Sequence, residues 1–405
     1  MASFLTTQYA GIGGVIKTCV EDFFVEELPL RQPRGEGTQV YILIEKREIS
    51  TMDAIAAIAK ALGIRRQDIG YAGQKDARAV ARQRISVDHI KIEKLRNLNI
   101  PKVRMLDFTR HDKKLAIGHL AGNRFVVRLR KIEQPIRKAE KIASDVFEIL
   151  AKKGVPNFFG PQRFGNRGDS HLLGEAIVKG RTDEFVDLFL GRPDDKELPA
   201  FSDARRLYEN GDYKSAFRKW PYSFADQRRA LKTLIETKGD KRRAYNVVDK
   251  HLKKFFVSAF QSELFNQVLD ARMPDIDKLL TGDMAYKHIN GAMFKVEDAA
   301  AEQPRCEAFE ISPTGPLVGG RMAALTGQAG DIENKIIAKA GLETRDLEQL
   351  ENYVRGGRRP LRFGPRNWAV AAGDDGLGQY LELKFELDSG SYATALLREI
   401  AKKDI

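Results

Sequence analysis

The sequence predicts an α+β fold in which a mainly helical segment interrupts a domain built around a sheet. Apolar and polar residues alternate in several short runs before residue 132, as they do in strands with one buried face. Charged, helix-like stretches dominate from about residue 170 to residue 355, and strand alternation then returns near the end of the chain. Because a single terminal strand is not stable without partners, its sheet must include the earlier strands.

The first elements follow from residue alternation and from helix caps. Residues 22–28 and 39–47 each alternate and bracket a Pro/Gly-rich stretch, so we expect them to pair as one hairpin. Residues 50–63 predict a helix in which Ser50 is the N-cap and Gly63 ends the last turn. The expected apolar face of this helix consists of Met52, Ile55, Ile58 and Leu62.

A further strand and helix follow. Residues 122–132 alternate and predict a strand, and residues 136–153 predict a helix that ends at Gly154. One face of the strand carries Phe125, Val127 and Leu129. The other face carries Arg124, Arg128 and Arg130, which we expect to point towards solvent or a ligand.

Two later segments carry regular apolar stripes. In the first, residues four apart predict the core-facing side of a helix: Phe256, Phe260, Leu264 and Val268. In the second, residues two apart predict the buried face of a strand: Leu381, Leu383, Phe385 and Leu387. A Gly-Ser turn follows this strand, and we expect Ser391 to cap a closing helix.

The composition limits the classes of function. The chain has 405 residues, 42% of them hydrophobic, which suffices for one large core or two domain-sized cores. The 68 Lys and Arg residues outnumber the 56 Asp and Glu residues, and the formal charge of +12 favours a polyanionic partner. The two cysteines are far apart and the six histidines are scattered, so neither a disulfide scaffold nor a metal site is expected. Without a secretory signal or a membrane-length apolar run, we expect a cytoplasmic protein that is not attached to a membrane.

The stretch GYAGQKDARAV, residues 70–80, places a lysine beside an aspartate in a glycine-rich turn. Gly70 and Gly73 permit a tight turn or a close backbone approach, so we expect Asp76 in a loop at the end of a strand. Lys75 and nearby basic groups would favour the ionised carboxylate. The alternative is that Asp76 caps a helix formed by the following ARAVARQ. The stretch lacks the pattern of a P-loop, which argues against a phosphoryl-transfer enzyme.

A second stretch, GVPNFFGPQRFGNRGDSH at residues 154–171, combines aromatic rings with arginines. Such a loop can stack on RNA bases and bind phosphates. The alternative is a buried aromatic corner with solvated arginines, but the Gly/Pro content and the lack of a regular apolar period argue against a purely structural core. The candidates for phosphate contacts here and in the later basic link are Arg163, Arg167, Arg355, Arg358 and Arg359.

Several blocks together resemble the TruD family of tRNA pseudouridine synthases. DFFVEE, GYAGQKDARAVARQRISV, GVPNFFGPQRFG, VSAFQSELFNQVL and SGSYATALLREI occur in the order and approximate spacing of that family and cover most of the chain. The resemblance implies a pseudouridine-synthase catalytic domain with a mixed, largely antiparallel sheet, interrupted by a mainly helical TRUD insertion domain. The corresponding segments are a first catalytic segment at 1–170, the insertion at 171–356 and a second catalytic segment at 357–405.

The resemblance also implies roles for single residues. Asp76 matches the catalytic aspartate, Phe159 the ring that stacks on the target base, and Asn157 the asparagine that organises its loop. Phe23 matches an aromatic residue at the base of the active site, and Lys17 a basic residue that pairs with the aspartate. The expected substrate-binding set is Phe159, Asn157, Phe23, Lys17, Lys75 and Arg163.

The activity that the resemblance implies is isomerisation of uridine to pseudouridine in a tRNA substrate, with uridine 13 as the target. The reaction breaks the C1′–N1 bond and rejoins the uracil through C5, so it requires neither a metal nor a small-molecule cofactor. It requires one ionised carboxylate that attacks C1′ or removes a sugar proton, with attack at C6 of the base as a further route. The alternative function is a non-catalytic RNA-binding or RNA-chaperone protein with a basic cleft. The intact Asp76 loop favours the enzyme, because a carboxylate that faces phosphates contributes little to RNA binding.

Overall fold

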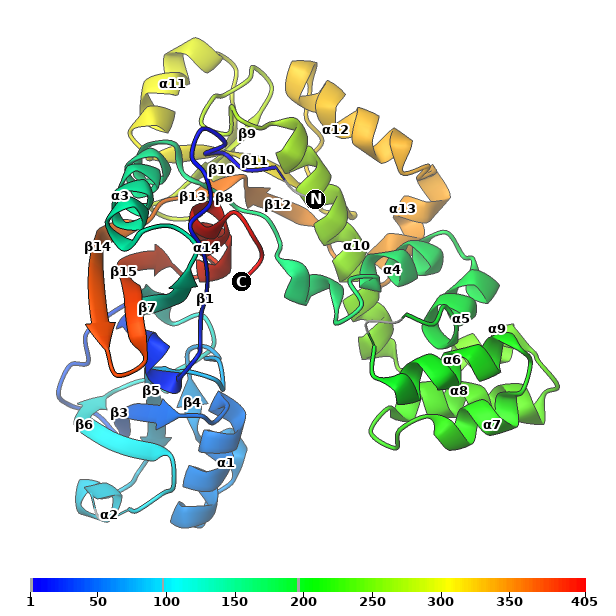
Figure 1. Ribbon diagram of the computed structural model, residues 1–405, viewed down its shortest axis with the longest axis horizontal. Helices are drawn as coiled ribbons and strands as arrows, with labels where there is room; N and C mark the ends of the chain where they lie inside the picture. Colours follow the sequence, from blue (N-terminus) through cyan, green and yellow to red (C-terminus); the bar gives the residue numbers. More distant parts are fainter. Residues whose placement is uncertain (1–2, 97, 195–196) are drawn as a thin grey trace. The chain divides into compact units, whose positions relative to one another are not determined.

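The structure of the chain is a computed structural model that describes residues 3–96, 98–194 and 197–405 (Figure 1). The chain forms two compact units. The sheet unit consists of Phe4–Pro156 and Phe363–Ile405, and the inserted unit consists of Asn157–Arg362 together with Ser3. Ser3 joins the inserted unit because its backbone N–H donates to the carboxylate of Asp270 (2.9 Å). The fold is therefore α+β, with one segment of the chain inserted between two parts of the other.

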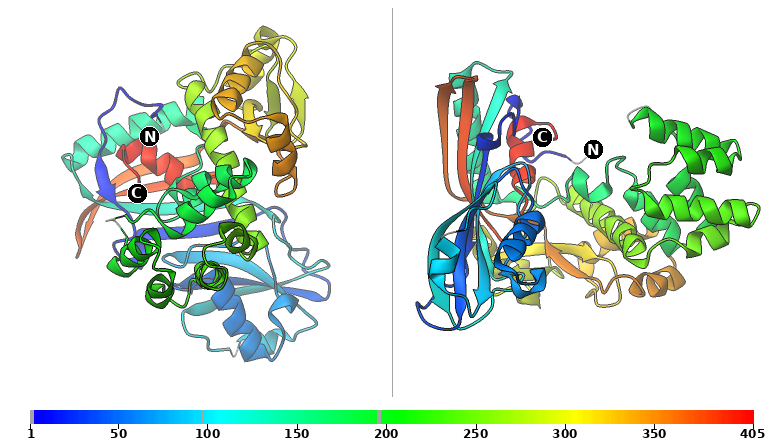
Figure 2. Two further views of the ribbon diagram at one scale, coloured as in Figure 1. Left: turned by 90° about the vertical axis from the view of Figure 1, so that its right-hand side faces the viewer. Right: turned by 90° about the horizontal axis from the view of Figure 1, so that it is seen from below.

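Among the described residues, the sheet unit contains a nine-stranded sheet (Figures 1 and 2). Its strands are β1 (Gly13–Val15), β2 (Phe23–Pro29), β3 (Gln39–Arg47), β4 (Gly70–Tyr71), β5 (Val80–Asp88), β6 (Val103–His111), β7 (Leu120–Ile132), β14 (Arg366–Asp375) and β15 (Gly378–Asp388). The main path runs β14-β15-β7-β2-β5-β3-β6, with β1 paired to β7 and β4 paired to β5. Strands β2 and β5 are parallel, whereas the ladders on either side of them are antiparallel. The sheet is therefore mixed and largely antiparallel, as predicted.

The predicted hairpin between β2 and β3 is wrong, because β5 lies between these two strands. Arg82 of β5 is opposite Glu26 of β2 on one side and opposite Glu45 of β3 on the other. The connection between β2 and β3 therefore crosses one strand, a distance of about 10 Å at the usual strand spacing. Alternation correctly located both strands, but it reports which face of a strand is buried and not which strand lies alongside.

The helices of the sheet unit are α1 (Thr51–Leu62), α2 (Ile92–Arg96), α3 (Ile136–Lys153) and α14 (Ala393–Ala401). In α1 the Ser50 side chain accepts the N–H of Asp53, and Gly63 ends the helix with φ 70°, which confirms both predicted caps. Buried residues on α1 include Ile55, Ile58 and Leu62. Met52 does not share that face: it is 40% exposed, and its neighbour Thr51 is buried in its place.

The strands β7 and β15 supply the core at the other end of the sheet, where α3 and α14 pack (Figure 2). The Phe125 ring of β7 stacks on Phe385 of β15 with centroids 5.3 Å apart, and the predicted buried faces of both strands are confirmed. Arg130 is an exception among the predicted outward arginines. Its guanidinium is buried between the carboxylates of Asp22 and Asp375, 2.8 Å from each.

The closing helix α14 begins one residue later than expected. Tyr392 occupies the N-cap position, so Ser391 lies outside the helix and the prediction that Ser391 caps it is wrong. The buried Glu399 of α14 instead accepts hydrogen bonds from the backbone of Leu5 and Thr6. These bonds attach the start of the sheet unit to its last helix.

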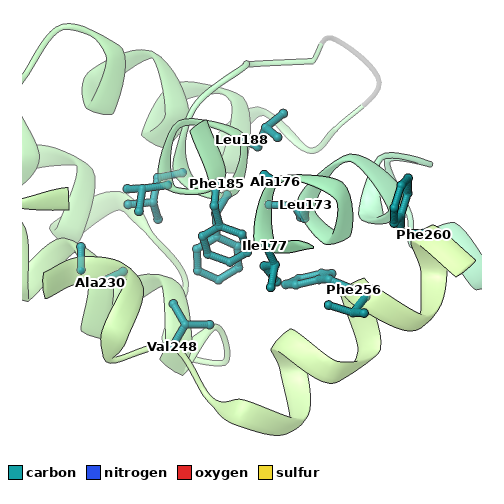
Figure 3. Close-up of a cluster of buried hydrophobic side chains, with 14 of the residues drawn as sticks. Leu173, Ala176, Ile177, Phe185, Leu188, Ala230, Val248, Phe256 and Phe260 are labelled. Carbon is teal, nitrogen blue, oxygen red and sulfur yellow. The ribbon is translucent and has the colours of Figure 1, made fainter. Parts of the chain in front are cut away.

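The inserted unit is mainly helical. Its helices are α4 (Ser170–Val178), α5 (Thr182–Leu190), α6 (Pro199–Glu209), α7 (Tyr213–Lys219), α8 (Ala225–Glu236), α9 (Lys241–Asn246), α10 (Lys250–Ala271), α11 (Ala299–Glu307), α12 (Gly327–Lys339) and α13 (Thr344–Glu351). Figure 3 shows side chains of α4, α5, α8 and α10 meeting in one apolar cluster, in which the predicted stripe residues Phe256 and Phe260 take part. Gly174 lets α4 approach α10 closely, because a Cβ there would lie 2.0 Å from the Phe256 carbonyl oxygen.

A small antiparallel sheet in the inserted unit was not predicted. Its strands are β9 (Met284–Lys287), β10 (Met293–Lys295), β11 (Ile311–Leu317) and β12 (Gly357–Pro360), in the order β10-β9-β11-β12. The strands are short, and β11 contains Pro313, Gly315 and Pro316. Because proline and glycine normally mark turns, this composition hides the strand from sequence reasoning.

The inserted unit extends beyond the predicted insertion, 171–356, at both ends. Before residue 171, the loop that carries Phe159 is bonded to Asn266 of α10. After residue 356, β12 pairs with β11 of the same unit. A two-residue ladder of β8 (Val155–Pro156) and β13 (Arg362–Phe363) lies where the chain changes from one unit to the other. In the described part of the chain, the helices are too short or too polar to span a bilayer.

Candidate active site

Asp76 lies in the loop between β4 and β5, and its side chain is 51% exposed. Because Val80–Asp88 is a strand, the alternative in which Asp76 caps a helix is wrong. Position 70 must be a glycine, because an added Cβ would lie 2.4 Å from the Leu115 carbonyl oxygen. Gly73 has space for a side chain, since the nearest atom would be 3.6 Å away. The close approach expected of these glycines therefore occurs at Gly70.

Lys17 is the direct partner of Asp76. Its Nζ lies 2.6 Å from Asp76 Oδ2 and 4.5 Å from the centroid of the Phe23 ring. Phe23 is fixed by the core, because it is 5% exposed and its ring meets Phe125 edge to face. The backbone of Lys17 adopts φ 59°, which is uncommon for a residue with a side chain. The sheet unit thus brings together Lys17, Phe23 and Asp76.

Lys75 points away from Asp76. Its ammonium lies 3.3 Å from the Glu27 carboxylate, and both side chains are buried. Burial raises the pKa of Glu27, although the charge of Lys75 partly offsets this effect. The structure therefore gives Lys75 a buried partner on β2, and the lysine whose ammonium lies beside Asp76 is Lys17, which the family resemblance pairs with that aspartate.

An open depression of about 400 Å³ is lined by residues that lie near Lys17 and Asp76 in the sequence, although neither of these two side chains lines it. Its lining includes residues 18–21, which follow Lys17 in the chain, together with Glu48 and Arg78. The guanidinium of Arg47 also lines it and pairs with Glu21 at 2.7 Å. The depression is large enough for a nucleotide-sized group, because typical ligand sites enclose about 300–1,000 Å³.

In the inserted unit, Asn157 organises the loop that carries Phe159. Its backbone N–H donates to the Leu361 carbonyl (2.9 Å), its side-chain amide donates to the Pro360 carbonyl (2.8 Å), and its Oδ1 accepts from Arg359. Asn266 of α10 bonds both polar groups of the Phe159 backbone, at 2.9 and 3.0 Å. The loop is therefore held from two sides.

Two arginines lie over the partly buried ring of Phe159. The guanidinium carbon of Arg359 lies 4.4 Å from the ring centroid, and that of Arg163 lies 5.6 Å from it. The Phe265 ring meets Phe159 edge to face at 5.4 Å. Arg163 is itself held by the hydroxyls of Ser258 and Ser262 on α10. The ring is thus an anchored aromatic group with two guanidiniums over it, and such cations are of the kind that bind the phosphates of RNA.

Two of the arginines expected to contact phosphates have other partners. Arg358 is buried in an ion pair with Glu333, so its assignment as a phosphate contact is wrong. Arg167 is largely buried, pairs with Asp169 at 3.0 Å and donates to the Arg192 carbonyl. Arg355 is exposed and keeps its place among the candidates. A basic Gly/Pro-rich sequence does not distinguish arginines that anchor a turn from those that face solvent.

Comparison with known families identifies the chain. The family model described as tRNA pseudouridine synthase D (TruD) matches residues 2–400. The chain belongs to the TruD family. Membership makes it an isomerase, in agreement with the resemblance that the GQKD and PNFFG blocks carry.

Relatives of the TruD family match the chain over almost its whole length. The tRNA pseudouridine synthase D of Geobacter metallireducens is 43% identical over 98% of this chain and 97% of its own. The protein of that name from Thermus thermophilus is 34% identical, over 98% of this chain and 92% of its own. A crystal structure from Methanosarcina mazei that bears the name TruD superposes with a TM-score of 0.88 at 27% identity, covering 100% of this chain and 97% of that one.

Sequence reasoning missed the side chains that hold the two loops of this TruD chain. Lys46 on β3 bonds the backbone of the Asp76 loop, and Asn266 on α10 bonds that of Phe159. A signal for Lys46 was present, because it continues the alternation Val40, Ile42, Ile44 on the buried face of its strand. A charged residue at a core-facing position indicates that a specific hydrogen-bonding partner is buried beside it.

Proposed function

We propose that the chain isomerises a uridine of tRNA to pseudouridine, with Asp76 as the reacting carboxylate and uridine 13 as the target. The observation that carries the proposal is the Lys17–Asp76 pair on an exposed loop, 2.6 Å between Nζ and Oδ2. Lys17 holds the carboxylate in one orientation, and exposure of the side chain leaves it accessible to a ribose.

The chemistry explains why a single carboxylate is central. The C1′–N1 bond breaks and a C1′–C5 bond forms, N1 gains a proton and C5 loses one, and no electrons are gained or lost overall. Asp76 can attack C1′ to form a transient ester, or accept a proton from the sugar, and both routes need a carboxylate oxygen directed at the ribose. Lys17 balances the charge of Asp76 until the substrate enters.

The reaction also needs the target base outside the RNA stack, and we assign this task to Phe159. Enzymes that act on a base extrude it and hold it by stacking and hydrogen bonds. Asn266 holds the backbone of Phe159, the Phe265 ring packs edge to face against the Phe159 ring, and the guanidiniums of Arg163 and Arg359 lie over it. Family resemblance supports the same role, because Phe159 is the second aromatic residue of the PNFFG block.

Mapping of pseudouridine tests this function directly. Unmodified tRNA is incubated with the purified protein, and mass spectrometry locates the converted uridines. We expect conversion of uridine 13 in tRNAs that carry one. Binding without any pseudouridine would favour the RNA-binding alternative, and conversion only at another uridine would refute the assigned target.

We expect the activity to survive removal of metal ions. The reaction is redox-neutral, and the described residues form no group of His, Cys, Asp or Glu that could hold a metal. The measurement is the initial rate after dialysis against EDTA, with magnesium then restored so that the tRNA folds. A rate that returns with zinc but not with magnesium would contradict the expectation.

Binding of tRNA should weaken steeply as salt rises, because Lys and Arg contacts to phosphates dominate affinity. Each contact contributes about 0.7–0.9 to the slope of log K against log salt, measured from about 50 to 500 mM. Replacing the exposed Arg355 by glutamine should lower the slope by about one such step, whereas Asp76→Asn should leave it unchanged. A flat salt response would show that the net positive charge does not hold the RNA.

A further inference from the structure

Three buried polar side chains surround the loop that carries Asp76. Lys46 of β3, Thr51 of α1 and Gln83 of β5 are all 2% exposed or less. Burying a polar group is unfavourable unless it is hydrogen-bonded, and burying a charge is more so. The partners of these side chains therefore indicate what they are for.

Lys46 uses all three of its donors on main-chain oxygens. Its ammonium donates to the carbonyls of Asp76 (2.6 Å), Ile49 (2.7 Å) and Lys75 (3.2 Å). An ammonium has three N–H groups, so this set satisfies it completely. Two of the three carbonyls belong to consecutive residues of the Asp76 loop, which fixes that peptide from the core side.

Thr51 and Gln83 hold the rest of the loop. The Thr51 hydroxyl accepts the backbone N–H of Lys75 (2.8 Å) and donates to Gln83 Oε1 (2.9 Å). The amide of Gln83 donates in turn to the Gly73 carbonyl (3.4 Å). The network thus contacts the backbone at Gly73, Lys75 and Asp76.

We propose that Lys46, Thr51 and Gln83 are positioning residues for catalysis, which hold the Asp76 backbone in place when the Lys17–Asp76 pair opens to admit the substrate. The inference rests on the proposed role of Asp76. Lys17 holds the carboxylate from the exposed side, but that ion pair must loosen before an oxygen can reach the ribose. The three buried side chains bond only to backbone and to one another, so their grip on the loop persists through that step. Misplacement of a reacting group by about 1 Å can cost about a hundredfold in rate.

The charge of Lys46 adds a pH dependence. Burial lowers the pKa of Lys46 to about 8, with the charge of Lys75 acting in the same direction and that of Asp76 opposing it. The residues opposite Lys46 on β5 and β6 are Ala81 and Val103, which carry no charge, and Thr51 on α1 is neutral. Above about pH 8 the neutral amine loses one donor and the charge that strengthens the other two bonds.

As the pH rises and Lys46 loses its proton, catalytic activity should fall while the free energy of unfolding rises. The folded pKa of Lys46 lies below its ordinary value, so between about pH 8 and 10 the unfolded chain binds more protons at this position. Loss of the Lys46 proton therefore makes folding more favourable as the pH rises through this window, while the hold on the loop weakens. A residue with a purely structural role would move activity and stability together.

The test compares Lys46→Met with wild type between pH 6.5 and about 9.5, a window that spans the pKa of Lys46. We expect the variant to lose kcat by about a hundredfold with KM for tRNA unchanged, and to lack the fall in kcat that wild type shows above about pH 8. The melting temperature of wild type relative to the variant should rise over the same window. Lys402→Met is the matched control, because Lys402 is another largely buried lysine of the sheet unit and pairs with Glu399; its kcat profile should match wild type.

Thr51→Val keeps the inference testable if Lys46→Met does not fold. Loss of the bond to the Lys75 N–H should lower kcat at constant KM, and Thr51→Ser, which keeps the hydroxyl, should restore it. Variants that keep wild-type kcat, or a Lys46→Met enzyme that keeps the alkaline fall, would overturn the inference. These outcomes are distinct from failure of the proposed function, which would appear as activity in Asp76→Asn.

Discussion

Replacing Asp76 by asparagine should abolish pseudouridine formation while tRNA affinity changes no more than a few-fold. The substitution keeps the shape of the side chain and removes its charge, its nucleophilicity and its ion pair with Lys17. Removal of an essential nucleophile or base costs on the order of 10³-fold or more in rate. One carboxylate among many basic contacts contributes little to binding of RNA, so the loss should lie in kcat.

The matched control is Asp68→Asn, which also removes a carboxylate of the sheet unit that pairs with a cation. Asp68 bonds Arg65 at 3.0 Å in the exposed turn before β4. This variant should form pseudouridine at the wild-type rate. If Asp76→Asn kept more than a few per cent of wild-type turnover, Asp76 would not be the reacting carboxylate.

The second large effect is expected for Phe159→Ala. Stacking of a base on an aromatic ring contributes about 1–3 kcal/mol. At about 1.4 kcal/mol per factor of ten, its loss should slow turnover from about tenfold to more than a hundredfold, at nearly equal tRNA affinity. The measurement is single-turnover conversion at saturating enzyme, together with a binding isotherm for the same tRNA.

Two further variants separate stacking from simple loss of packing. Phe159→Tyr keeps the ring and should remain within a few-fold of wild type. Phe224→Ala removes another partly exposed ring of the inserted unit and should leave turnover unchanged. A Phe159→Ala enzyme with normal turnover would show that the extruded base is held by other groups.

Local sequence patterns predicted the secondary structure well because they report local physics. The caps of α1 and the buried faces of β7 and β15 follow from side chains a few residues apart. Strand order does not follow in this way, because pairing joins residues that are distant in sequence. The misplaced hairpin between β2 and β3 is the clearest instance, since β5 enters between two strands that are consecutive in the chain.

The candidate site was predictable where residue type and motif point to chemistry, as for Asp76 and Phe159. The family resemblance also implied that Lys17 pairs with Asp76, whereas position in the sequence alone does not indicate which lysine reaches the carboxylate. Lys75 is adjacent to Asp76 in sequence, yet its side chain turns to Glu27 while Lys17, far away in sequence, reaches the carboxylate. The sequence indicates that Lys46 faces the core, because Lys46 continues the buried alternation of β3. It does not indicate that Lys46 bonds the Asp76 loop, because that contact forms only in the folded chain.

The most direct test of the account uses unmodified tRNA that carries tritium at C5 of its uridines. Because the new C1′–C5 bond displaces the hydrogen at C5, tritium release counts turnovers without any assumption about the intermediate. Wild type and Asp76→Asn are compared at enzyme excess, and the product is mapped by mass spectrometry. We expect one equivalent of tritium and pseudouridine at position 13 with wild type, and neither with Asp76→Asn. Tritium release by Asp76→Asn, or none by wild type that binds the tRNA, would contradict it.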